Sequence, residues 1–542
     1  MGRKKRKTTI GGIFLFLLSG LLALLNTESV FAAPKPPSDP DRFTSIVVEY
    51  TSYEWWLLRW GDNEVVCEMN IEHEDKPTLD EVYIDCGEAL YTAWLEQEAC
   101  PPEVISRKPA ECPGYYLHHS SSTLKEREIA LALPPSVVWI TLEGCFPKDG
   151  TNRCDLPPTL VLRGDEPLSG EKILGIKGEL DGESFSCDSA LCELPLSETD
   201  EEGITLSFWA DSSYGDSSHL FDAHIRVIYM EDEETDEHFW YVDVLSAQWR
   251  GEANASCSES WDAFPPIGGV PEWLSTPEDV ADLESDLPYN YLAGNLISRN
   301  IVDASHCADF GIDVYGQATP CGLDAAEPAM LEWQNRFDVL IMKASEETSI
   351  PATLIKRLFA RESQFWPGVF NAGDDVGLGQ LTENGADIAF LWNPVFFEEF
   401  CPLVFEGDEC DSGYLALDEA QQERVRGALV YSVNAMKDDA PLGVDLAQAN
   451  YSVNVFANTL LGSCEQTGTV VFNNTAQSPG ALTSYEDLWK FTLVNYNAGA
   501  GCLSLALGET IGNNQEINWE NLSSNLTVVC MGAKDYVEDI SE

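Results

Sequence analysis

The chain has 542 residues, 44% of them hydrophobic and 10% aromatic, so it is long and apolar enough for several domains with sizeable cores. Its formal net charge is −60, from 91 acidic and 31 basic residues. A surface this acidic repels phosphate groups and anionic lipids, so nucleic acid is not an expected partner and an anionic membrane surface is a poor one. The acidic surface itself is interpreted as a solvated face with no specific role.

The chain contains 16 cysteines and seven histidines, and no two cysteines are separated by two residues. This spacing argues against a zinc site, and neither a metal nor another cofactor is expected. In an exported protein these cysteines are expected to form disulfides. Close spacing predicts four of the bridges: Cys145–Cys154, Cys187–Cys192, Cys307–Cys321 and Cys401–Cys410. Spacing does not pair the other eight cysteines.

Residues 1–32 are predicted to be a signal peptide. Five basic residues precede an apolar run from Ile10 to Leu25, and Val30-Phe31-Ala32 offers a small-residue cleavage site. The apolar run is shorter than the roughly 20 residues that a spanning helix prefers. Cleavage is the favoured interpretation and a retained anchor is the alternative, so we expect a secreted or cell-envelope protein with no other membrane segment.

Residues 33–135 are predicted to form a β-rich domain. Ser45–Tyr50 and Glu81–Asp85 alternate apolar and polar residues as strands do. A cluster of aromatic residues in this domain is interpreted as core and strand-pairing material, with a glycan-stacking platform as the alternative: Tyr50, Tyr53, Trp55, Trp56 and Trp60.

Residues 136–245 are predicted to form an immunoglobulin-like β-sandwich, because strand patterns recur there at short intervals. The clearest expected strands are residues 137–142, 159–162, 204–209 and 224–229. The polar loop 211–218 is interpreted as a turn, although its composition also suits calcium or sugar binding. An irregular connector is expected at residues 246–285.

Helical spacing dominates residues 286–542, with helices expected at 329–347, 422–436 and 447–461. A further helix is expected within residues 349–367, with Ser349 as its N-cap, Pro351 in its first turn and Pro367 as its stop. Glu362 continues the apolar stripe of this helix. A buried carboxyl group has a raised pKa, which suits a general acid.

Two later motifs follow Glu362-Ser363: Gly377-Leu378-Gly379-Gln380 and Tyr496-Asn497-Ala498-Gly499. In this order the three motifs resemble the lytic transglycosylases of the lysozyme-like superfamily, over roughly residues 327–507. The resemblance implies a mainly α, lysozyme-like domain at residues 286–542, so together with the strand patterns we expect a multidomain chain in which N-terminal all-β, sandwich-like domains precede it.

The resemblance also implies an activity: cleavage of the bond between N-acetylmuramic acid and N-acetylglucosamine in peptidoglycan, leaving 1,6-anhydro-muramoyl ends. Glu362 would be the single general acid and base. Ser363, Gly377, Gln380, Tyr496 and Asn497 would contact the substrate or hold the site. The family has Met where this chain has Gly379, so the resemblance does not predict the shape of the substrate groove at that position. Peptidoglycan strands, and envelope proteins bound through the β domains, are the expected partners.

Two other functions compete with this one. A goose-type muramidase shares the fold and hydrolyses the same bond, with a second carboxylate from the nearby acids Asp374, Asp375, Glu383 and Asp387. A non-catalytic glycan-binding or structural envelope protein is the other alternative. The residues between Asn393 and Cys410 lengthen the chain between the second and third motifs and are interpreted as an insertion over one end of the groove.

Overall fold

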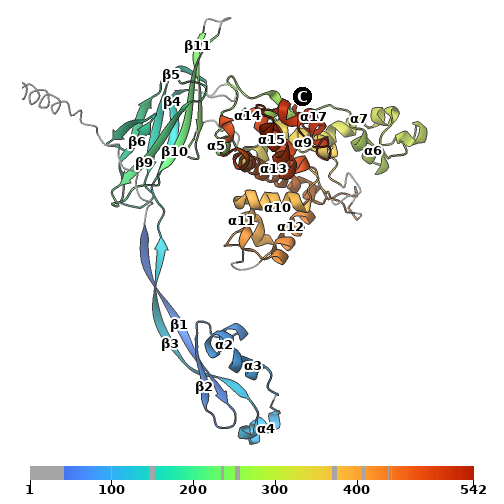
Figure 1. Ribbon diagram of the computed structural model, residues 1–542. Helices are drawn as coiled ribbons and strands as arrows, with labels where there is room; N and C mark the ends of the chain where they lie inside the picture. The colour runs from blue at the N-terminus through green and yellow to red at the C-terminus, as the bar shows by residue number, and fades with distance from the viewer. Residues whose placement is uncertain are drawn as a thin grey trace, which may run out of the picture. The chain divides into compact units, whose positions relative to one another are not determined.

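The computed structural model describes residues 42–98, 100–145, 153–232, 237–250, 257–368, 375–405, 409–437, 439–440 and 442–542 (Figure 1). The predicted signal peptide lies outside these residues. The chain divides into two compact units. One contains residues 39–135 and 167–171, and the other contains residues 136–166 and 172–542.

The smaller unit is built on a three-stranded antiparallel sheet with strand order β2-β1-β3. Its elements are β1 (Phe43–Arg59), β2 (Val65–Ile71), α2 (Leu79–Cys86), α3 (Glu88–Leu95), α4 (Pro102–Arg107), the short 3₁₀ turn η1 (Pro109–Glu111) and β3 (Tyr115–Ala132). A small core joins the sheet to α2, and its buried members are Trp55, Leu57, Met69, Ile71 and Val82. The expected strand at residues 45–50 is confirmed as part of β1.

The expected strand at Glu81–Asp85 is wrong, because these residues belong to the helix α2. Thr78 is the N-cap of this helix: its hydroxyl accepts a hydrogen bond from the Glu81 amide while the Glu81 carboxylate accepts one from the Thr78 amide. Such a capping box favours a helix over a strand, and only Val82 of α2 is buried. With α2, α3 and α4 present, the N-terminal part is not all-β.

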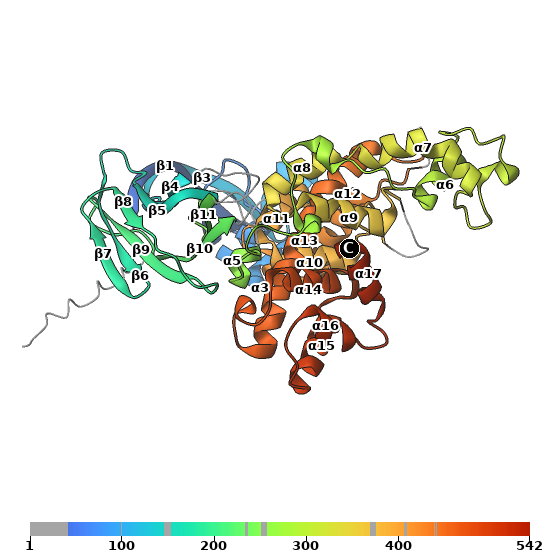
Figure 2. The ribbon, with the colours of Figure 1, turned by 90° about the horizontal axis from the view of Figure 1, so that it is seen from above.

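A second, eight-stranded sheet belongs to the larger unit and follows the order β4-β5-β11-β10-β9-β6-β7, with β8 paired to β5. Its strands are β4 (Val137–Cys145), β5 (Arg153–Asp165), β6 (Ile173–Leu180), β7 (Glu183–Cys187), β8 (Leu191–Pro195), β9 (Ile204–Ser212), β10 (Phe221–Asp232) and β11 (Glu237–Leu245). The four strands expected from the sequence here are confirmed. Figure 2 shows that the sheet is curved, and buried apolar side chains of its strands form a core.

Side-chain contacts of Asp211 hold loop 211–218 of this sheet in its conformation. Asp211 accepts a hydrogen bond from Ser217 and pairs with the Lys177 ammonium group at 2.6 Å. Burial acts to raise the pKa of Asp211, but the hydrogen bonds from Lys177 and Ser217 outweigh it and hold this pKa below its usual value. The geometry is that of a turn.

Helices dominate the chain from residue 257 onward, so the expected order of a β region followed by a helical region is confirmed. The α-helices are α5 (Cys257–Trp261), α6 (Asn290–Ser298), α7 (Pro320–Asn335), α8 (Asp338–Thr348), α9 (Ala352–Ser363), α10 (Glu383–Trp392), α11 (Pro394–Phe400), α12 (Glu419–Val433), α13 (Leu446–Thr475), α14 (Tyr485–Ala498), α15 (Ala500–Gly512), α16 (Trp519–Ser524) and α17 (Gly532–Ser541). Short 3₁₀ turns link them: η2 (Glu272–Leu274), η3 (Val280–Leu283), η4 (Ala308–Gly311), η5 (Cys401–Leu403), η6 (Tyr414–Ala416) and η7 (Pro479–Ala481). No helix in the described ranges has the length and apolar character needed to cross a membrane.

The prediction of a single helix at residues 329–347 is wrong in one respect, because the structure has two helices there. These are α7 and α8, which meet at Arg336 and Phe337. The helix expected at 447–461 is longer than predicted and reaches Thr475 as α13. One large core, to which most of the helices contribute, surrounds α13 and α9.

Eight disulfides link all 16 cysteines. The four bridges predicted from close spacing are confirmed. The other four are Cys67–Cys86, Cys100–Cys112, Cys257–Cys464 and Cys502–Cys530. So many bridges indicate folding in an oxidising, extracytoplasmic environment.

A buried ion pair holds α9 in place. The Lys356 ammonium group of α9 donates to Asp338 Oδ2 and to Asn335 Oδ1, both at 2.8 Å, and to the Leu283 carbonyl at 2.5 Å. Both charged side chains are almost fully enclosed. Burial raises the pKa of Asp338 to about 6 even with the ammonium group beside it. The pair therefore ties α9 to α7, α8 and the segment before α6.

We predict that Asp338→Asn destabilises the larger unit by about 3 kcal/mol, because it leaves the Lys356 charge buried without a counter-charge. Urea unfolding followed by far-ultraviolet circular dichroism measures the change. The control is Lys343→Gln, which removes an exposed ion pair with Glu347 and should cost about 0.5 kcal/mol or less. Equal effects of the two substitutions would contradict a special role for the buried pair.

Candidate active site

The helix α9 ends with Glu362 and Ser363, and its boundaries differ from those expected. Ser349 is not its N-cap, because this residue ends α8 in a left-handed conformation with φ of 54°. Pro351 takes the N-cap position and the helix starts at Ala352. Gln364, with φ of 47°, ends the helix three residues before Pro367. The carboxyl group of Glu362 therefore sits in the last turn, next to a sharp change in chain direction.

Glu362 is half-buried, and its Oε1 accepts a hydrogen bond of 2.7 Å from the Tyr536 hydroxyl of α17. Burial raises the pKa of Glu362 to about 7. The Tyr536 hydrogen bond and the Arg361 charge act in the opposite direction, and the Asp375 charge adds to the increase. Near neutral pH this carboxyl group is therefore divided between its protonated and ionised forms.

Two further contacts fix α17 against α9. The Arg361 guanidinium group pairs with Asp539 at 2.9 Å, and Arg357 donates to the Ile540 carbonyl at 3.0 Å. Burial strongly raises the pKa of Tyr536, with the Glu362 charge as the next cause, so its phenol stays protonated and donates to the carboxylate. The C-terminal helix thus supplies the hydrogen-bond partner of Glu362.

Tyr536 was not among the residues predicted for the site. Its helix has apolar positions at helical spacing, and Ala533, Tyr536, Val537 and Ile540 are buried. That pattern is visible in the sequence and predicts a docked face with Tyr536 in it. The pattern does not reveal that the Tyr536 hydroxyl contacts Glu362, because the two residues lie 174 positions apart in the sequence.

The motif around Gly377 forms a tight turn. A β-bridge joins Val376 to Leu381, and Gln380 has a left-handed backbone with φ of 53°. The Gln380 Nε2 atom donates to the Gly368 and Gly377 carbonyls, at 3.0 and 2.6 Å. Gln380 thus braces the turn, and its predicted contact with a glycan stays a prediction.

Gly377 and Gly379 let this turn approach α13 closely. Gly377 has φ of 81°, a conformation that favours glycine. A Cβ atom added at Gly379 would lie 2.5 Å from Cδ1 of the Phe456 ring, and one at Gly377 would lie 3.0 Å from the Val433 carbonyl oxygen. Phe456 is buried and belongs to α13. A side chain at position 379 would therefore meet the Phe456 ring.

Tyr496 connects the third motif to this turn. Its hydroxyl donates to the Gly379 carbonyl at 2.8 Å. Burial raises the pKa of Tyr496 well above its usual value, and the Glu362 charge adds to the increase. Glu362, the Gly377–Gln380 turn and Tyr496 are thus brought together from three separate parts of the chain.

The remaining two predicted residues, Ser363 and Asn497, differ in burial. Ser363 is fully buried, and its hydroxyl donates to the Phe359 carbonyl one turn earlier at 3.2 Å. It packs the end of α9, and its predicted role in orienting Glu362 or binding substrate stays a prediction. Asn497 is exposed near the end of α14, beside Tyr496, and its predicted role stays a prediction.

Of the four acids considered as a second carboxylate, Asp375 is the one whose charge acts on Glu362. Asp387 is occupied by other partners: its carboxylate accepts from Arg426 at 3.1 Å and from the Tyr414 hydroxyl. Glu383 opens α10, and Asp374 lies outside the described residues. Among the described acids, Asp375 is therefore the candidate that the electrostatics of Glu362 single out.

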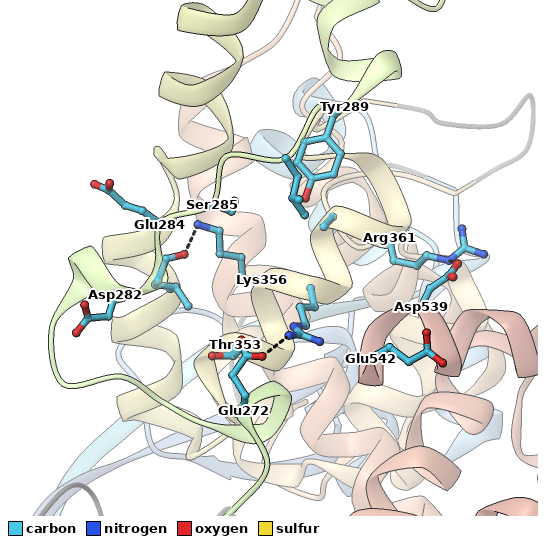
Figure 3. A pocket seen from close by; sticks show the side chains of 14 residues that line it. Glu272, Asp282, Glu284, Ser285, Tyr289, Thr353, Lys356, Arg361, Asp539 and Glu542 are labelled. Carbon is cyan, nitrogen blue, oxygen red and sulfur yellow. Dashed lines mark hydrogen bonds and ion pairs between the residues drawn. The ribbon is translucent and has the colours of Figure 1, made fainter. Parts of the chain in front are cut away.

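A pocket of about 600 Å³ lies beside α9, but Glu362 is not among the residues that line it. It is lined by Thr353, Lys356, Arg357, Ala360 and Arg361 from α9 and by acidic residues that include Glu272, Asp282, Glu284, Asp539 and Glu542 (Figure 3). Arg357 pairs with Glu272 and Arg361 with Asp539. These ion pairs link α9 to its neighbours.

Two groups of potential metal-ligating side chains occur among the described residues. They are His306 with Cys307 and Cys321, and Glu465 with Cys257 and Cys464. In both groups the cysteines are joined as disulfides, so their sulfur atoms are not thiolates. Neither group has the donor set of a transition-metal site.

Comparison with known proteins identifies no family. No family model matches the chain, and no curated protein matches it. Among solved structures, a polysaccharide lyase matches with a TM-score of 0.14 and 10% sequence identity. That match covers 80% of this chain and 52% of the lyase chain, so this chain spans about half the length of that structure. Similarity at this level supports no inference about fold or function.

We predict that Gly379→Ala destabilises the larger unit by about 1–3 kcal/mol, because the new methyl group overlaps the Phe456 ring. Thermal unfolding of single and double variants tests the contact. In a double-mutant cycle Phe456→Leu should offset part of the cost of Gly379→Ala. Strict additivity of the two substitutions would contradict the proposed overlap.

Proposed function

We propose that this protein is an exported glycan-cleaving enzyme, and more specifically a peptidoglycan lytic transglycosylase with Glu362 as its single general acid and base. The observation that carries the proposal is the position of the Glu362 carboxyl group, half-buried beside the Gly377–Gln380 turn and Tyr496 and hydrogen-bonded to Tyr536, where burial raises its pKa to about 7. An acid with this pKa both gives and takes a proton near neutral pH.

The proposed reaction uses this carboxyl group twice. Protonated Glu362 gives its proton to the glycosidic oxygen between N-acetylmuramic acid and N-acetylglucosamine as the bond from C1 to that oxygen breaks. The carboxylate then takes the proton from the 6-hydroxyl of the muramoyl residue, and that oxygen forms the new bond to C1. The product is a 1,6-anhydro-muramoyl end, no water is consumed, and Glu362 is protonated again.

Local contacts support separate roles for the neighbours of Glu362. Tyr536 donates to the carboxylate and so stabilises the ionised form that follows the first proton transfer. Tyr496 holds the glycine-rich turn through the Gly379 carbonyl. In the proposal this turn forms one wall of the glycan-binding groove, and Gln380 faces the sugar from it.

A goose-type muramidase is the second candidate, and the effect of the Asp375 charge on Glu362 favours it. In this candidate Asp375 is the second carboxylate, which activates a water molecule. The two candidates differ in product: hydrolysis gives reducing ends, whereas transglycosylation gives anhydro ends.

The proposal extends to the fold and the location of the chain. We assign residues 286–542 to a lysozyme-like fold and residues 136–245 to an immunoglobulin-like sandwich that positions the enzyme on the envelope, where it meets partner proteins. The eight disulfides support an extracytoplasmic location. Peptidoglycan strands are the proposed substrate.

We predict that Glu362→Gln lowers the turnover of purified sacculi at least about 100-fold, because the variant has no proton to transfer. Mass spectrometry of the released muropeptides measures the loss and shows whether the wild-type products carry anhydro or reducing ends. Turnover by the variant close to that of the wild type would refute the assignment of Glu362.

The same variant carries its own folding control. The folded protein holds the Glu362 proton more tightly than the unfolded chain, so wild-type stability falls as the pH rises from about 4.5 to about 7. Glu362→Gln lacks this penalty and should be more stable than the wild type above neutral pH, by up to about 3 kcal/mol. A lower melting temperature than the wild type at alkaline pH would instead indicate damage to the fold.

We predict that Tyr536→Phe shifts the alkaline limb of the pH profile of kcat/KM upward, by about one unit or less. The variant loses the hydrogen bond that lowers the pKa of Glu362, so the acid stays protonated to a higher pH. The control is Tyr485→Phe, which alters another buried tyrosine and should leave the limb in place. An unmoved limb in Tyr536→Phe would show that this phenol does not tune Glu362.

A further inference from the structure

The N-terminal half of β1 is paired on one side only. It is antiparallel to β3 from Phe43 onward, whereas its pairing with β2 begins at Tyr53. In the described part of the chain no strand pairs with the other edge of residues 43–52. Every second backbone N–H and C=O group of this stretch therefore points outward, as in any edge strand.

This free edge is apolar and exposed. The exposed fractions are 58% for Phe43, 42% for Ile46, 62% for Val47 and 37% for Val48. Between Phe43 and Ser52 the sole charged residue is Glu49. A two-stranded ribbon is marginally stable in water. Pairing with a further strand rich in β-branched residues stabilises such a ribbon.

The outer edge of β3 differs, because charges protect it. Lys125 and Arg127 lie on one face of the strand, and Glu126 and Glu128 lie on the other, since side chains alternate along a strand. Two copies of β3 that pair antiparallel about a two-fold axis bring same-face residues together. The registers centred on Glu126 or Arg127 therefore set like charges opposite each other, which is destabilising.

The same symmetry operation applied to β1 meets no such repulsion. With Val47 opposite itself, Ile46 lies opposite Val48 of the second copy, and Ser45 lies opposite Glu49. Thr44 then faces Tyr50, and Phe43 faces Thr51. Each pair is β-branched, aromatic or polar, and no two like charges meet. The charged stretch of β3 thus opposes pairing with its own copy in these two registers, whereas the register of β1 centred on Val47 meets no like charges.

We propose that the free edge of β1, residues 43–52, pairs antiparallel with the same edge of a second copy of this chain, centred on Val47. The two ribbons then form a continuous four-stranded sheet in the order β3-β1-β1-β3. Chain symmetry makes the contact isologous and closed, so the product is a dimer and not a fibre. The interaction lies in the smaller unit and does not depend on the activity proposed for Glu362.

The experiment compares two double variants that differ only in the charge at position 46. In Ile46→Glu/Val48→Glu, acidic side chains oppose each other twice across the interface. In Ile46→Lys/Val48→Glu, each lysine faces a glutamate of the other copy. Within one ribbon, residue 48 lies opposite Arg127 and residue 46 opposite Ile129, so neither variant places like charges across the hairpin. Circular dichroism verifies that both variants fold.

Sedimentation of the full chain at concentrations up to ~100 µM measures the dimer, since a complex with micromolar Kd is nearly complete there. We expect the wild type and Ile46→Lys/Val48→Glu to be dimers, and Ile46→Glu/Val48→Glu to have a Kd at least about tenfold higher. Leu124→Lys, an equally exposed change on the protected edge, should dimerise as the wild type does. A monomeric wild type, or double variants that behave alike, would overturn the proposal; a monomeric wild type would leave the edge to a strand of another protein.

Discussion

The candidate site depends on the docking of the C-terminal helix α17 against α9. The contact places the Tyr536 hydroxyl 2.7 Å from Glu362 Oε1 and surrounds the carboxyl group with buried side chains. Burial disfavours the charged form and raises its pKa, while the phenol stabilises the same charge through a hydrogen bond. The balance of these two effects near neutral pH is what makes Glu362 suitable for proton transfer.

The rest of the helical region supports this contact from both sides. The buried pair of Lys356 and Asp338 fixes the first half of α9 to α8. The disulfide Cys502–Cys530 links α15 to the segment just before α17. On the opposite side, the glycine-rich turn reaches α13 because Gly379 leaves room for the Phe456 ring. Together these contacts fix the surroundings of the Glu362 carboxyl group.

In the two β regions the constraint is the edge of the sheet, where backbone N–H and C=O groups can pair with a further strand. In the larger unit the sheet is curved, and buried apolar side chains of its strands form a core. In the smaller unit, β1 and β3 extend beyond β2 as a two-stranded ribbon, and only one of its outer edges carries a run of charges. The difference between the two edges is the basis for the proposed pairing of two copies.

Local patterns in the sequence determined most of the elements. Alternation predicted the strands near residues 137, 159, 204 and 224, and close spacing predicted four disulfides, because both depend on neighbours along the chain. The β-to-α order follows from the same patterns. They failed at Glu81–Asp85, where alternation alone did not reveal the capping box of Thr78 and Glu81. They also failed at Ser349, which resembles an N-cap but ends the preceding helix.

Tertiary structure alone decided the environment of each candidate residue. The sequence places Glu362 on an apolar stripe, but its raised pKa requires the burial and the Tyr536 contact that only packing provides. Ser363 follows the acid in sequence and is nevertheless enclosed by its own helix. Likewise, the ring that a side chain at position 379 would meet belongs to Phe456, a residue far along the chain. The order of the three motifs predicted that Glu362, the Gly377–Gln380 turn and Tyr496 lie together, but the contacts of Tyr536 and Phe456 depend on how helices pack and not on local spacing.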